Sequence, residues 1–146
     1  MLLRALLLSL LLAAAPALRA ADFPWNRVAV EPMKTSIYVG SVTLTAGPFV
    51  RDGENFSTTY EAKVRPWFFW GESGTITIKV PAAELQKLAQ GQRAEFTGEG
   101  FNQKHKRRTV TGYAQPADAT TGKIKVRITV DGIELIFNGT YRLATE

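Results

Sequence analysis

The amino-acid sequence predicts an all-β protein, an antiparallel barrel or sandwich of about eight strands with one short helix at about residues 81–90. Apolar and polar residues alternate along most of the chain, which is the pattern of half-buried strands. Turn-forming Gly, Asn, Asp and Pro residues separate the alternating segments, and one segment has helical spacing. Short strands at this spacing are typical of small barrels and sandwiches, and we favour a closed or nearly closed barrel.

Residues 1–20 have the parts of a cleavable secretory signal peptide. Arg4 supplies a short positive region, and a leucine-rich uncharged run follows from Ala5 to Leu18. Small residues then allow cleavage after Ala17 or after Ala20. The uncharged run is shorter than the roughly 20 residues that a membrane-spanning helix needs. We therefore expect an exported protein, periplasmic or secreted, with residues 21–146 as a single β-rich domain and no transmembrane segment after cleavage.

The composition excludes disulfide bonds and lipidated cysteine, and its charge bears on the kind of partner. The chain has no cysteine, so neither disulfides nor a lipid-modified N-terminal cysteine are available. The formal net charge is +5, and Arg4 and Arg19 of the predicted signal peptide contribute to it. The mature domain is therefore only mildly basic, and this charge does not indicate a specific nucleic-acid partner.

Strands are predicted in the first half of the mature chain from alternation and from β-branched or aromatic content. Phe23 and Trp25 precede them, and we expect both to pack against the domain and hold its N-terminal segment in place. The predicted strands are Arg27–Glu31, Ser36–Ala46 as one strand, Phe56–Arg65 and Thr75–Val80.

The single helix is predicted from its end signals. Pro81 suits the first helical position, Glu84 lies in the first turn, and Leu85 and Leu88 share one face. Gly91 suits the left-handed residue that ends many helices. So short a helix is not stable alone, and we expect it to lie on the sheet or to close one barrel end.

The second half of the chain contains the clearest strand pattern. Further strands are expected at Arg93–Gly98, Thr109–Ala114 and Lys123–Val130. Asp131-Gly132 then predicts a tight hairpin turn, because both turn positions tolerate positive φ. The returning strand keeps its apolar parity from Ile133 to Leu143. We therefore interpret Asn138-Gly139 as a bulge or bend within one long strand.

Consecutive aromatic residues follow Pro66 and make the first candidate site. An extended backbone would send Trp67 and Phe69 to one side and Phe68 and Trp70 to the other. Exposed aromatics of this kind bind sugar faces, bind apolar ligands or lie in a membrane interface, whereas buried ones close one end of a core. The predicted ligand-binding residues are Trp67, Phe68, Phe69, Trp70, Tyr60 and Tyr113.

A basic run between two predicted strands makes the second candidate site, on a hairpin tip. Its residues are Lys104, His105, Lys106, Arg107 and Arg108, and together they create a local positive potential. Such a loop can hold an anionic polymer, a lipid headgroup or an acidic protein surface. The alternative is a solvated loop that keeps a strand edge from pairing with other chains.

The sequence lacks the usual groups of catalysis and cofactor binding. The one histidine, His105, lies among cations that would repel a metal ion, so we expect neither a metal site nor a Ser-His-Asp system. There is no nucleotide-binding glycine motif, and no cofactor is expected. A hydrolase that pairs two of the carboxylates Glu61, Glu95, Glu99 and Asp118 is a minority alternative.

The expected function is therefore non-catalytic binding outside the cytoplasm. The leading hypothesis is a small apolar or glycan ligand on the aromatic residues. The alternative is a cell-envelope interaction module that uses the basic loop.

Overall fold

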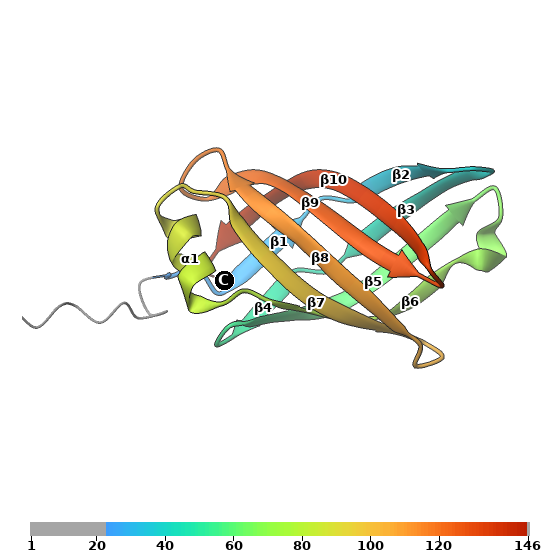
Figure 1. The fold of residues 1–146 in the computed structure, drawn as a ribbon, viewed down its shortest axis with the longest axis horizontal. Coiled ribbons are helices and arrows are strands. Elements are labelled where there is room, and N and C mark those ends of the chain that lie inside the picture. The colour runs from blue at the N-terminus through green and yellow to red at the C-terminus, as the bar shows by residue number, and fades with distance from the viewer. Residues whose placement is uncertain (1–22, 146) are drawn as a thin grey trace, which may run out of the picture.

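The computed structural model describes residues 23–145, so the predicted signal peptide and its cleavage sites lie outside the described residues. Within these residues the chain forms ten strands, one α-helix and one 3-10 turn (Figure 1). The first strands are β1 (Arg27–Val30), β2 (Met33–Ile37), β3 (Gly40–Ala46), β4 (Phe49–Asp52) and β5 (Asn55–Arg65). After them come η2 (Phe68–Trp70), β6 (Glu72–Lys79), α1 (Ala82–Ala89), β7 (Ala94–Asn102), β8 (Arg107–Pro116), β9 (Thr121–Val130) and β10 (Ile133–Ala144).

The strands close into an antiparallel barrel. The ring runs β5-β6-β7-β8-β9-β10-β1-β4 and returns to β5, so eight strands close it. The other two strands, β2 and β3, form a hairpin that extends the wall beyond β1 and β4, and β3 pairs with the second half of β5. The predicted all-β class is confirmed, and the barrel is confirmed over the sandwich.

The hairpin of β2 and β3 corrects one predicted element. The sequence predicts a single strand from Ser36 to Ala46, but the chain turns at Tyr38-Val39. Gly40 permits this turn to lie close to β5, because a Cβ there would stand 2.0 Å from the backbone oxygen of Arg65. The short strand β4 was also missed, because its four residues carry too little alternation to identify.

The last hairpin follows the prediction closely. Asp131 and Gly132 have φ of 49° and 80°, as a tight turn of this kind requires. β10 is one long strand whose register with β9 continues unbroken through Asn138 and Gly139, so the expected bulge is wrong. Gly139 instead makes room for a neighbour, because a Cβ there would lie 2.5 Å from Cγ of Met33.

Helix α1 covers one mouth of the barrel, which we call the helix end. Glu84 lies in the first turn of the helix and Gly91 follows it with φ of +77°, as expected, whereas Pro81 lies at the N-cap, one residue before the predicted first helical position. Leu85 is 1% exposed and packs into the barrel core. The short amphipathic segment is thus stabilised by the barrel that it closes.

Side chains fill most of the barrel interior. The described part of the barrel contains a cavity of about 90 Å³ beneath α1 and another of about 100 Å³ toward the opposite mouth. Phe23 is buried in the same core, and Arg51 holds it by a hydrogen bond of 2.6 Å from Nη1 to the Phe23 backbone oxygen. Trp25 packs against the core as well, so the predicted docking of this segment is confirmed.

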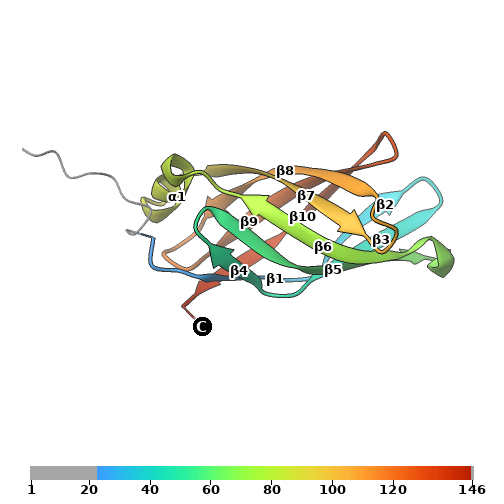
Figure 2. The same ribbon diagram turned by 90° about the horizontal axis from the view of Figure 1, so that it is seen from below.

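The mouth opposite α1, which we call the loop end, carries the turns that concern function. They are residues 38–39, 66–71, 103–106 and 131–132. Figures 1 and 2 both place these turns together, away from α1 and from the C-terminal strand end.

Candidate binding surface at the loop end

Exposed aromatic and aliphatic side chains gather on two adjacent turns of the loop end. We call them the aromatic patch; its members are Tyr38, Val39, Trp67, Phe68, Phe69 and Trp70. Phe68 is 82% exposed and Phe69 is 64% exposed. The expected alternation of buried and exposed rings is wrong, because residues 68–70 form a 3-10 turn with no buried member instead of an extended strand.

The patch is held together by ring packing and one hydrogen bond. Trp67 lies 6.1 Å from Phe69 and 5.6 Å from Trp70 between ring centroids, and Phe69 meets Trp70 edge to face. The indole Nε1 of Trp67 donates to the backbone oxygen of Val39 at 3.2 Å, which joins the two turns. The rings therefore form one compact projecting cluster rather than a flat row.

The hairpin tip between β7 and β8 carries exposed positive charge. Lys104, His105 and Lys106, which we call the basic tip, are all exposed. Asn102 at the base of the tip is buried, and its Oδ1 accepts hydrogen bonds of 2.9 Å from the backbone nitrogens of Lys104 and Lys106. One internal acceptor thus fixes the backbone that presents the lysines.

Two arginines of the predicted basic loop are used within the protein. Arg107 pairs with Glu99 on the outer wall at 2.8 Å. Arg108 is 6% exposed and points into the barrel, so the structure removes it from the exposed basic loop. The reason is strand parity: Arg108 and Val110 lie on the buried face of β8, and Thr109 lies on the other.

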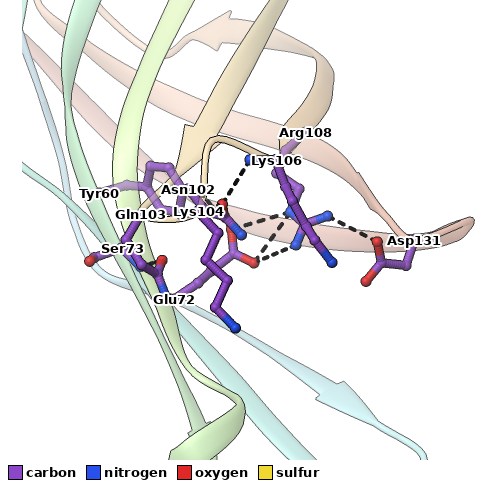
Figure 3. Close-up of polar contacts among 9 residues, drawn as sticks. All are labelled: Tyr60, Glu72, Ser73, Asn102, Gln103, Lys104, Lys106, Arg108 and Asp131. Atoms are coloured by element: carbon purple, nitrogen blue, oxygen red, sulfur yellow. Dashed lines mark hydrogen bonds and ion pairs between the residues drawn. The ribbon is translucent and has the colours of Figure 1, made fainter.

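Arg108 is the buried centre of a polar cluster at the loop end (Figure 3). Its Nη2 donates to Glu72 Oε1 at 2.9 Å, and its Nη1 donates to Asp131 at 3.2 Å. Tyr60 donates its hydroxyl hydrogen to Glu72 Oε2 at 2.5 Å. The cluster therefore links β5, β6, β8 and the β9–β10 turn.

The cluster shifts the acidity of its members. Burial by itself would raise the pKa of Glu72, but hydrogen bonds from Arg108 and Tyr60 and the charge of Arg108 outweigh it and hold this pKa below its ordinary value. The pKa of Tyr60 is raised, first by burial and then by its hydrogen bond to the Glu72 carboxylate. Glu72 is thus kept as an anion and Tyr60 as a neutral donor.

The predicted ligand-binding residues do not all come together. Tyr60 and Trp70 both line the cavity at the loop end, so Tyr60 lies beneath the aromatic patch. Tyr113 lies elsewhere, on the outer wall, where the Arg93 guanidinium sits 4.0 Å from its ring centroid. The sequence does not predict Tyr38 and Val39 as site residues, because they fall within the predicted strand Ser36–Ala46.

The candidate catalytic carboxylates are separate from one another, and three of the four contact other residues. Glu61 lies 3.7 Å from Lys63, and Glu99 pairs with Arg107. Asp118 accepts hydrogen bonds within its own turn, including 2.8 Å from the Thr121 backbone nitrogen. Glu95 is exposed on β7.

An open groove lies beside the aromatic patch on the outer wall. Its volume is about 530 Å³, and its lining includes Phe68, Arg65, Ser73 and Gln103. Gln103 accepts a hydrogen bond of 3.1 Å from the Ser73 backbone nitrogen, so the β7–β8 tip borders this groove. The aromatic patch and the basic tip are thereby neighbours on one surface.

No family model matches the chain, and no curated protein matches it. Among residues 23–145, no group of three His, Cys, Asp or Glu side chains is arranged to hold a metal ion. Within the same range, the structure contains no helix with the length and apolar character needed to cross a membrane.

Proposed function

We propose that this chain is an exported, non-catalytic binding module that attaches to an anionic component of the cell envelope through its loop end. The observation that carries the proposal is that the exposed aromatic patch and the basic tip share the loop end, where Phe68 and Gln103, the residue before Lys104, line one groove. Large exposed apolar surfaces on small proteins mark interaction sites, and adjacent lysines favour an anionic partner. The leader-like residues 1–20 supply the argument for export.

The interior offers less support for a ligand site than the surface does. Pockets for small molecules have volumes of about 300 Å³ or more. The two interior cavities are near 90 and 100 Å³, and the one beneath α1 is lined by apolar side chains. We therefore assign binding to the outside of the loop end and treat the barrel as its scaffold.

Heparin provides a soluble anionic probe for the test. Residues 21–146 should be retained on a heparin column at low salt and released as salt rises. The variant K104Q/K106Q should elute at clearly lower salt. The matched control K79Q/K123Q removes the same charge from exposed strand positions and should elute close to wild type. If both variants lower the eluting salt concentration equally, retention depends on net charge alone, which would contradict the proposal.

A glycan ligand is the second candidate, and the open groove favours it. Phe68 offers a ring beside the polar side chains of Arg65, Ser73 and Gln103, which is a combination suited to sugar hydroxyls. Cellohexaose and chitohexaose, titrated while tryptophan fluorescence is followed, would test it. Saturable quenching that F68A abolishes would favour this candidate over the first.

A further inference from the structure

We infer that the partner of the loop end is the surface of an anionic lipid bilayer. In this inference the aromatic patch enters the boundary between headgroups and acyl chains, while the basic tip contacts lipid phosphates. The inference rests on the proposed function and adds the identity of the surface that is bound.

The shape of the patch fits a soft apolar layer better than a rigid partner. The turns that carry it project from the end of the barrel (Figures 1 and 2). Phe68 meets Phe69 at 78° and Phe69 meets Trp70 at 82°, so neighbouring rings present edges and faces in different directions. Rings at such angles to one another lack the flat platform on which sugar rings stack, whereas a lipid layer adapts to them.

The residue types are those that gather at membrane–water boundaries. Trp and Tyr are enriched there because their rings are apolar at one end and polar at the other. The polar end of Trp67 is already satisfied, since its indole N–H donates to the backbone oxygen of Val39. Moving this ring out of water therefore leaves no unpaired donor, which is the usual cost of burying tryptophan.

The charges beside the patch are complementary to anionic headgroups. Lys104 and Lys106 are exposed on the neighbouring tip, and Arg65 is exposed where β5 enters the aromatic turn. The carboxylates of Glu72 and Asp131 at this end both bind the Arg108 guanidinium, which offsets one of their two negative charges. Each lysine near an anionic bilayer strengthens binding by about fivefold.

The docking surface is organised before it binds. Trp67 ties the aromatic turn to the Val39 turn, and Asn102 fixes the backbone at Lys104 and Lys106. Gln103 joins the basic tip to Ser73 at the start of β6. Because these turns are already held, binding orders few additional residues and more of the contact energy appears as affinity.

Vesicle flotation with residues 21–146 tests the inference. We expect binding to vesicles of phosphatidylcholine with phosphatidylglycerol and weak binding to phosphatidylcholine alone. The variant F68S/F69S should lose most binding, by tenfold or more, and K104Q/K106Q should lose binding in a salt-dependent way. The matched control V50S/I136S removes two exposed apolar side chains from the barrel wall and should bind as wild type does.

Depth of insertion separates docking from simple charge attraction. Brominated acyl chains should quench the fluorescence of Trp67 and Trp70, and F68S/F69S should reduce the quenching. Circular dichroism of each variant establishes that the barrel is intact. Retention on heparin without flotation on either vesicle overturns the inference and leaves the proposed function standing. Failure on heparin and on vesicles alike overturns both.

Discussion

Arg108 of β8 and Glu72 of β6 meet inside the barrel, with 2.9 Å between Nη2 and Oε1, although β7 lies between their strands. The contact crosses the curved interior rather than a strand ladder. Glu72 also accepts a hydrogen bond from Tyr60 on β5. One carboxylate on β6 therefore contacts side chains from both β5 and β8. The base of the loop end is held by this buried cluster.

Removing Arg108 is expected to destabilise the fold strongly. R108A would leave the Glu72 carboxylate buried without its cationic partner, which costs about 3–5 kcal/mol in similar buried pairs. R107A, which breaks the exposed pair with Glu99, should cost less than about 1 kcal/mol. Urea unfolding of both variants measures the difference. Comparable losses would mean that the Arg108 pair contributes no more than a surface pair.

Glu72 predicts a specific loss of stability in acid. Its pKa is lower in the folded protein than the ordinary value of 4.5, so it stabilises the fold fully above about pH 4.5. The contribution is lost as pH falls through the folded pKa. E72Q should therefore show a shallower decline of the free energy of unfolding below pH 4.5. Some decline should remain, because the pKa values of Glu84 and Asp118 are lowered too.

Tyr141 predicts the opposite dependence in alkali. Burial first, and the charge of Asp118 second, raise its pKa from 10.0 to about 12. A raised folded pKa means that stability is complete below pH 10 and falls as pH rises through 12. Y141F should flatten this fall in denaturant unfolding measured across that range. The same slope in Y141F and wild type would assign the alkaline loss to other groups.

Gly112 is expected to be intolerant of any side chain. A Cβ there would lie 2.1 Å from the backbone oxygen of Lys125 and 2.7 Å from Cζ of Phe96, whose ring covers this glycine from β7. G112A should destabilise by about 1–3 kcal/mol or more, because β8 and β9 must move apart. T111A, at the exposed neighbouring position, should stay within about 1 kcal/mol. Thermal unfolding compares the two variants.

Much of the fold could be predicted from the sequence, because apolar and polar residues alternate along strands that have one buried face and one exposed face. Lys123–Val130, the Asp131-Gly132 turn and the long returning strand were located in this way, and α1 was located from its end signals. The sequence predicts one strand where the hairpin of β2 and β3 lies, since Tyr38 and Val39 are residue types that strands favour. Periodicity identifies strands better than it identifies turns made of strand-forming residues.

The candidate surface was only partly predictable. The aromatic run and the basic run are predicted as separate features, but their adjacency depends on strand pairing, in which β6 lies between β5 and β7. Trp67 reaches Val39 across 28 residues of sequence, and no local pattern records that contact. The inward position of Arg108 was recoverable in principle from its shared parity with Val110.

The two ends of the described chain lie beside each other in the barrel wall. Arg27 is paired with Ala144, and the Asn26 backbone nitrogen donates to the Ala144 oxygen at 3.1 Å. A short linker could therefore join these two segments covalently, as their hydrogen bonds already join them in the barrel wall. New termini could then open at the exposed loop around Gln92, after α1 and away from the aromatic patch. A circular permutant of this design should keep the barrel and leave its whole loop end uninterrupted.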